Sequence, residues 1–259
     1  MSRIIAFVYG VICYVFFFAS FLYAAGFVGG FLVPLSLDSA PTGPFGTSLL
    51  IDLGLLGLFA VQHSVMARPA FKRVWTRVVP EPVERSTYVL ASSLALILLF
   101  WQWRPLGGVV WDVQDPIGRA ILWGGFAFGW LLVLVTTFLI NHFDLFGLRQ
   151  VWLHLLGRPY QPLPFKMPAL YRVVRHPLYV GWFFAFWSTP TMTAAHLLFA
   201  VATTAYILIA IQLEERDLVA AHPEYAEYRR RVPMLVPSIR RSEPAAGSAT
   251  AAAAVRQRS

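Results

Sequence analysis

The chain has 259 residues, of which 58% are hydrophobic and 13% are charged, whereas a soluble domain carries about 25% charged residues. Together with a mean hydropathy of +0.61, this composition excludes an ordinary soluble protein and predicts an integral membrane protein. The single Cys13 excludes a disulfide within one chain.

Six apolar segments are long enough to cross, or nearly cross, about 30 Å of hydrocarbon. The first is too long for a signal-peptide core, so we expect it to remain as a helix that tilts or breaks near Gly29 and Gly30. The fifth has only 12 residues between Pro177 and Pro190, about 18 Å of helix, so it is a half-span unless its helix begins before Pro177. We therefore predict an all-α membrane bundle of about six transmembrane helices, or five plus a short half-span. The segments are 4–33, 49–65, 88–103, 117–140, 178–189 and 195–213.

The positions of lysine and arginine predict how these helices are oriented. Of the 21 such residues, only Arg104 and Arg119 fall on one side of the predicted membrane; the others lie near the N-terminus, in 67–87, in 141–177 and beyond 213. The positive-inside rule therefore places both termini in the cytoplasm, with the protein in a bacterial inner membrane. The net charge of +8 then reflects attraction to anionic membrane lipid, and we expect no nucleic-acid partner.

The longest connection, 141–177, lies on the cytoplasmic side. Its aromatic and aliphatic residues predict an interfacial amphipathic segment that ends near Gly157, and a proline-rich strip follows. A connection this long in a compact protein is usually functional or disordered, and its aromatic content argues against disorder. We expect residues 1–237 to form a single transmembrane domain with a cytoplasmic-side cap built from 141–175 and 214–237. The segment 238–259 reads as a disordered tail.

Side chains able to carry chemistry converge on the cytoplasmic face. Arg175 and His176 precede the short fifth segment, and Glu214 and Glu215 follow the sixth. Such a cluster at the edge of the hydrocarbon is costly to place, so function is the default interpretation, with snorkelling interfacial anchors as the structural alternative. The same face receives further polar residues from the ends of the second and fourth segments: His63, His142 and Asp144.

These histidines also allow a metal-site alternative. His63, His142, His176 and a carboxylate could form a three-histidine site of the kind that zinc or iron accepts. Neither a His-x-x-x-His pair on a helix nor a cysteine ligand supports it, so we expect no metal.

Two motifs flank the last helical hairpin, Arg175-His176-Pro177-x-Tyr179-x-Gly181 and Glu214-Glu215-x-x-Leu218, the second followed by Tyr225-x-x-Tyr228-x-x-x-Val232-Pro233. This last third of the chain resembles the membrane methyltransferases related to isoprenylcysteine carboxyl methyltransferase. The runs 62–68 (QHSVMAR) and 141–150 (NHFDLFGLRQ) resemble a narrower branch, the methanethiol S-methyltransferases, and also membrane proteins associated with nitrite and nitric-oxide reduction. Over its whole length the chain is most similar to the methanethiol S-methyltransferases.

The resemblance implies that S-adenosylmethionine binds between the cap and the helix ends, in a cofactor-binding part at about 141–237. Tyr171, His176 and Tyr179 match the family's cofactor contacts, and Glu214 or Glu215 matches its adenosyl-binding glutamate. Residues 163–166 occupy the place of the strip that the family uses before that tyrosine, and Lys166 or Arg175 would meet the cofactor's carboxylate.

One departure from the isoprenylcysteine enzymes bears on the substrate. They carry an arginine four residues before the adenosyl-binding glutamate, where this chain has Ala210 or Ile211. The partner of a prenylcysteine carboxylate is therefore missing, which favours a small neutral or thiolate acceptor.

The resemblance thus implies methyl transfer to the sulfur of methanethiol, giving dimethyl sulfide and S-adenosylhomocysteine. Because a thiol is mostly protonated at neutral pH, we expect His63 and His142 to act on its proton, with Asp144 orienting a histidine. Two alternatives stay open: a non-enzymatic membrane protein that supports denitrification, and a membrane methyltransferase acting on a lipid amine or a prenylated thiol.

Overall fold

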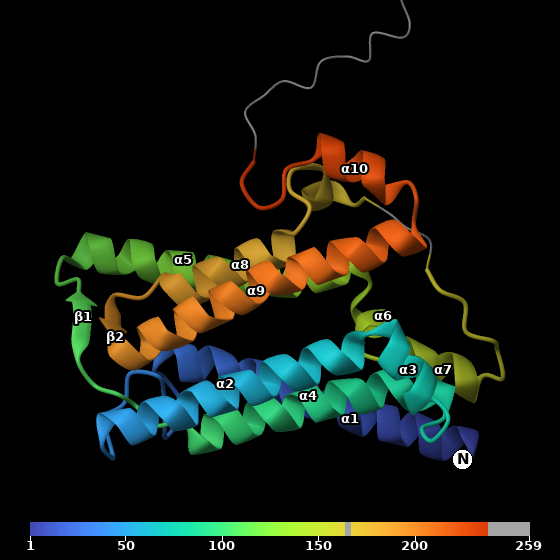
Figure 1. The fold of residues 1–259 in the computed structure, drawn as a ribbon, viewed down its shortest axis with the longest axis horizontal. Coiled ribbons are helices and arrows are strands. Elements are labelled where there is room, and N and C mark those ends of the chain that lie inside the picture. The colour runs from blue at the N-terminus through green and yellow to red at the C-terminus, as the bar shows by residue number, and fades with distance from the viewer. Residues whose placement is uncertain (164–166, 238–259) are drawn as a thin grey trace, which may run out of the picture.

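The computed structural model describes residues 1–163 and 167–237, and it is an all-α bundle (Figure 1). Within these residues, five helices are long and apolar enough to cross a membrane: α1 (Arg3–Gly29), α2 (Phe45–Ala67), α4 (Glu81–Gln102), α5 (Pro116–Ile140) and α9 (Ala194–Ala221). The prediction of an integral, multi-pass helical protein is confirmed. As expected from its glycines, α1 ends where Gly30 adopts a left-handed conformation with φ of 71°.

Helix α8 (Pro177–Trp187) is the predicted short element. It begins at Pro177, which has no N–H to lose at a helix start, and its 11 residues extend about 16 Å. Of the two alternatives for this segment, the half-span is correct.

Helix α8 packs closely against α5 because glycines remove the side chains between them. A methyl group on Gly129 would overlap the backbone of Gly181 and Ala185, and one on Gly181 would lie 2.8 Å from Val133. The two helices run antiparallel, and extending this register by one turn predicts that Thr137 lies level with Pro177. The glycine contact therefore fixes the C-terminal half of α5 relative to α8.

The opposite end of the bundle contains a small sheet that the sequence did not predict (Figure 1). Strands β1 (Val109–Asp112) and β2 (Thr191–Thr193) pair antiparallel. Thr191 Oγ1 donates to Asp112, 79 residues earlier in the sequence, at 2.9 Å. Asp38 accepts bonds from Thr193 and, at 2.9 Å, from the buried His196. These contacts join the loop that contains Asp38, strand β1 and strand β2 at the end of the bundle opposite the predicted site.

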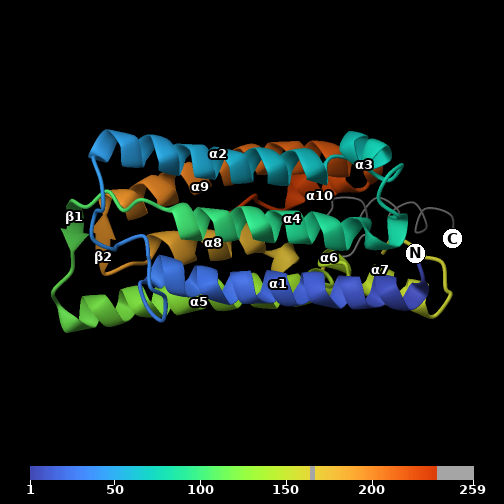
Figure 2. The ribbon, with the colours of Figure 1, turned by 90° about the horizontal axis from the view of Figure 1, so that it is seen from below.

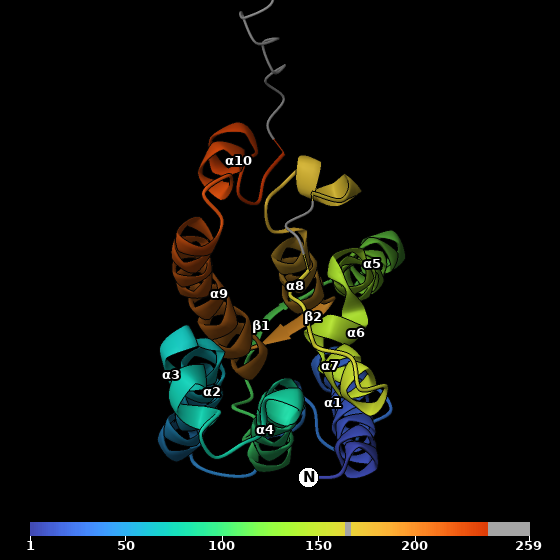
Figure 3. The same cartoon turned by 90° about the vertical axis from the view of Figure 1, so that its right-hand side faces the viewer.

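The short helices lie at the other end: α3 (Pro69–Trp75), α6 (His142–Leu145), α7 (Leu148–Leu155), α10 (Tyr225–Arg231) and the 3-10 turn η1 (Ala169–Arg172). Figure 3 shows this end, with α10 and η1 lying beyond α8 and α9, and with α6 and α7 between α5 and α1. Figure 2 shows α4 between α1 and α2, the helices it packs against. Of the short helices, α7 packs on α1 and α4.

Candidate active site

The segment Arg175–His176 is held against the residues that follow α10 by backbone hydrogen bonds. The N–H of Arg175 donates to the carbonyl of Pro233 at 2.8 Å, and the N–H of His176 donates to that of Met234 at 3.2 Å. Tyr228 reinforces the arrangement, since its hydroxyl donates to the carbonyl of Tyr171 at 2.6 Å. The two predicted motifs therefore form one structural unit.

Glu215 is the centre of this unit. Glu215 is 2% exposed. Its carboxylate lies 2.7 Å from Arg175 Nε, 3.0 Å from His176 Nε2 and 3.2 Å from Arg229 Nε. The Arg175 guanidinium also donates to the carbonyls of Arg229 and Val232. A buried carboxylate with three cationic or imidazole partners has little capacity left for a ligand.

Glu214 has a different environment. It is only partly buried, and the Tyr179 hydroxyl donates to its carboxylate at 2.9 Å. Near it, burial and the charge of Glu214 raise the pKa of the Tyr171 phenol, which therefore stays protonated at neutral pH. One carboxylate with spare acceptor capacity thus lies beside two neutral tyrosines.

The structure places His142 at the turn between α5 and α7. The ring is 2% exposed, with Thr137 Oγ1 2.8 Å from Nδ1 and the Tyr14 hydroxyl 2.8 Å from Nε2. Phe138 stacks on the ring at a centroid distance of 4.2 Å. Burial lowers the pKa of His142, so the neutral imidazole predominates at neutral pH.

Asp144, two residues further on, does not orient a histidine. Its carboxylate pairs with Arg149 at 2.8 Å and also accepts from Gln150 and Tyr160. Among the described residues, none of its bonds reaches the imidazole of His63 or His142. The Asp144–Arg149 pair instead joins α6 to α7.

His63 lies among hydroxyl groups from α4. Its Nδ1 is 3.1 Å from Ser92 Oγ, and the Tyr88 hydroxyl is 3.0 Å from its Nε2. Ser64, next to His63, lies 3.1 Å from the Tyr206 hydroxyl, so the cluster also contacts α9, the helix that carries Glu214. The convergence of His63 with the cofactor end stays a prediction.

Sequence reasoning missed the residues that hold the histidines. Tyr14, Thr137, Tyr88 and Ser92 lie inside apolar segments where hydroxyl groups read as ordinary helix residues. A polar side chain within a transmembrane segment was the available signal, because it needs a partner there. Lys166 lies outside the described residues.

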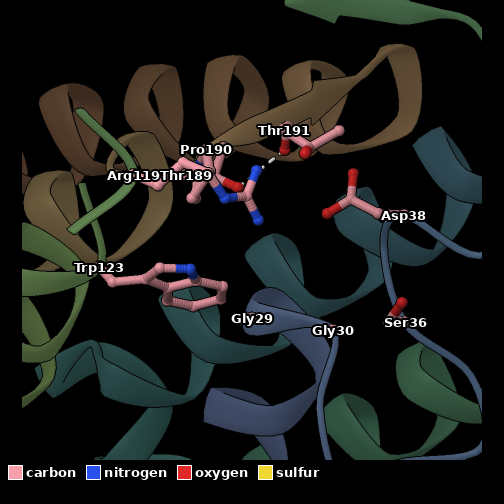
Figure 4. Close-up of a pocket in the computed structure, with 9 residues that line it drawn as sticks. All are labelled: Gly29, Gly30, Ser36, Asp38, Arg119, Trp123, Thr189, Pro190 and Thr191. Carbon is pink, nitrogen blue, oxygen red and sulfur yellow. Dashed lines mark hydrogen bonds between the residues drawn. The ribbon is translucent and has the colours of Figure 1, made fainter. Parts of the chain in front are cut away.

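The metal-site alternative finds no support in the described part of the chain, where no three His, Cys, Asp or Glu side chains gather around a common point. His63, His142 and His176 each have separate partners. A cavity of about 280 Å³ does exist, but at the opposite end of the bundle, lined by Asp38, Arg119 and Trp123 among others (Figure 4). None of the predicted site residues lines it.

The chain is similar in sequence to known methanethiol S-methyltransferases. The chain is 60% identical over 240 residues to a methanethiol S-methyltransferase of Crocosphaera subtropica, covering 92% of this chain and 94% of that protein. It is 55% identical over 238 residues to a methanethiol S-methyltransferase of Mycobacterium tuberculosis, covering 92% and 98%. A more distant relative is nurim of Mus musculus, at 36% identity over 66% of this chain and 68% of nurim. No family model and no solved structure matches.

Proposed function

The chain belongs to the methanethiol S-methyltransferases, and on that premise we propose that it transfers a methyl group to the sulfur of methanethiol, giving dimethyl sulfide. The names of the relatives favour this activity over a role in denitrification. We further propose that S-adenosylmethionine is the donor, and that the reaction takes place at the cytoplasmic side of a bacterial inner membrane.

The different environments of Glu214 and Glu215 are our reason for assigning the cofactor contact to Glu214. S-adenosylmethionine supplies an electrophilic methyl group on a cationic sulfonium. A partly exposed carboxylate beside two tyrosines fits such a cation and its adenosine, and Glu214 with Tyr171 and Tyr179 provides that set. Glu215 is already committed to Arg175, His176 and Arg229, so its role is to hold the cap.

The remaining cofactor contacts follow from the same bonds. His176 uses Nε2 for Glu215, and its Nδ1 forms no bond with the described residues, so Nδ1 is free to meet the donor. The Arg175 guanidinium donates hydrogen bonds to Glu215 and to two backbone carbonyls, so we assign Arg175 a positioning role. Lys166 remains our candidate to bind the carboxylate of S-adenosylmethionine.

The acceptor thiol must lose its proton because the thiolate is the nucleophile. His63 and His142 are our candidates for the base: His142 is a buried, neutral imidazole, and His63 lies among the hydroxyl groups of Tyr88 and Ser92. Since a thiolate and a sulfonium neutralise each other along the reaction path, exclusion of water speeds the step. Asp144 contributes by fixing α6, the helix that carries His142.

The activity is tested with purified protein in detergent, methanethiol and S-adenosylmethionine, with dimethyl sulfide measured in the headspace. We expect product with the wild-type protein and with Arg230→Ala, whose side chain is exposed, and at least tenfold less with Glu214→Ala. Formation of no dimethyl sulfide, with methylation of a lipid amine or a prenylated thiol instead, would replace the acceptor proposed here.

A further inference from the structure

The hydrogen bonds around His142 determine which of its ring nitrogens carries the proton. Thr137 Oγ1 donates its single proton to the carbonyl of Leu134 at 2.6 Å, so it accepts from the Nδ1–H of His142. A neutral imidazole protonated at Nδ1 is an acceptor at Nε2, where the Tyr14 hydroxyl therefore donates. Both nitrogens are occupied, and a thiol has direct access to neither.

The Tyr14 hydroxyl is the one member of this chain of bonds that is not enclosed. Tyr14 is partly exposed on α1, and its oxygen keeps free lone pairs after donating to Nε2. Beside it lies Phe143, whose ring contacts Phe138, and these two residues are 50% and 54% exposed. An apolar thiol dissolved in hydrocarbon would reach this oxygen before it reached His142.

Resting on the proposed function, we infer that Tyr14 is a catalytic residue that passes the proton of the acceptor thiol to His142. The thiol S–H gives its proton to the Tyr14 oxygen while the Tyr14 proton moves to Nε2 of His142. The sulfur keeps the electron pair, which forms the new C–S bond as the C–S bond of the donor sulfonium breaks. The proton remains on the imidazolium, whose Nδ1–H stays bonded to Thr137.

The packing of α5 on α8 places this relay beside the cofactor contacts. Gly129 and Val133 lie against Ala185 and Gly181, and extending this antiparallel register by one turn brings Thr137 level with Pro177, the residue that follows His176. Thr137 holds His142, and His142 holds Tyr14. Two hydrogen bonds thus link the Tyr14 hydroxyl to Thr137 of α5, the helix that packs against α8.

The charges around His142 permit it to accept a proton. The stacked ring of Phe138 favours an imidazolium by a cation–π interaction. From α6 and α7, the charged groups are Asp144 and Arg149, which neutralise each other, and α1 contributes only the phenol of Tyr14. The described residues of α5 contribute no charge near the ring.

The test compares Tyr14→Phe with Tyr9→Phe, a matched control on the same helix whose hydroxyl bonds Thr87 at 3.0 Å. Rates are measured against pH with methanethiol and with the more acidic trifluoroethanethiol, and donor affinity is measured separately. We expect Tyr14→Phe to lose about a hundredfold in turnover with methanethiol at neutral pH, the scale of general base catalysis. The loss should shrink at high pH and with the acidic thiol, because both supply a thiolate without the relay.

Two results would overturn the inference: wild-type turnover in Tyr14→Phe, or an equal loss at every pH and with both thiols, which would show a structural role. Unchanged donor affinity and thermal midpoint in Tyr14→Phe are required for the relay. A wild-type protein that methylates neither thiol would instead refute the proposed function itself.

Discussion

Glu214 and Glu215 are neighbours in α9, yet the carboxylate of Glu215 is buried among Arg175, His176 and Arg229. The carboxylate of Glu214 meets, among the described residues, only the Tyr179 hydroxyl. Successive helical residues point about 100° apart, so one faces the cap and the other faces the bundle. We therefore expect the two glutamates to have different roles: Glu215 holds the cap together, and Glu214 binds the methyl donor.

This division predicts opposite effects of the same substitution. Glu215→Gln should lower stability by about 3 kcal/mol, because it leaves Arg175 buried without its counter-charge. Glu214→Gln should leave the thermal midpoint nearly unchanged and weaken donor binding by about tenfold to a hundredfold. Thermal unfolding in detergent and calorimetric titration with S-adenosylhomocysteine measure the two quantities. Equal effects of both variants on both measurements would contradict the assignment.

The pH dependence of activity should report the burial of His142. Burial lowers its pKa below the usual value of about 6.5, so the neutral imidazole persists at pH 6.5 and the rate should fall only at lower pH. The sign for stability follows: as the pH falls below about 6.5, the unfolded chain binds a proton that folded His142 does not, and folding stability decreases. His142→Gln should remove this decrease. An acid limb with its midpoint at or above pH 6.5 would count against His142 as the base.

The contact between α5 and α8 offers a test of how the site is positioned. Gly129→Ala should destabilise the protein and reduce turnover, since a methyl group there would overlap the backbone of Gly181 and Ala185. Gly124→Ala on the same helix meets no atom within 4 Å and should be neutral or slightly stabilising. Thermal midpoints and dimethyl sulfide formation separate the two variants. Comparable behaviour of both would mean that the close approach is not needed.

Orientation in the membrane is also open to direct measurement. Reporter fusions after residues 75 and 150 should read as cytoplasmic, and fusions after residues 40 and 112 as external. The physical reason is the concentration of Lys and Arg at the end of the bundle that carries α3, α6, α7 and α10. An external signal at residue 150 would place His142 on the wrong side for a cytoplasmic donor.

The sequence predicted the long helices and the half-span because apolar length and proline positions determine them locally. It also predicted that His63, His142, His176 and the two glutamates would lie at one end, since that follows from topology. It did not predict that Asp144 would pair with Arg149, nor that Tyr14 and Thr137 would hold His142, because these bonds join residues 5 to 128 positions apart and depend on how helices pack. The β1–β2 sheet escaped prediction for the same reason, since its strands are short and pair across the bundle.

The shortness of α8 has a consequence for the lipid around the protein. A helix of 11 residues covers about half of a typical hydrocarbon layer, so the chain at its start must lie below the headgroups or the bilayer must thin around it. Acyl chain length would then set how deeply the reacting groups are immersed. In vesicles of defined phosphatidylcholines, turnover should pass through a maximum as the chains lengthen, and thicker bilayers should slow the arrival of a water-soluble donor more than that of a volatile thiol.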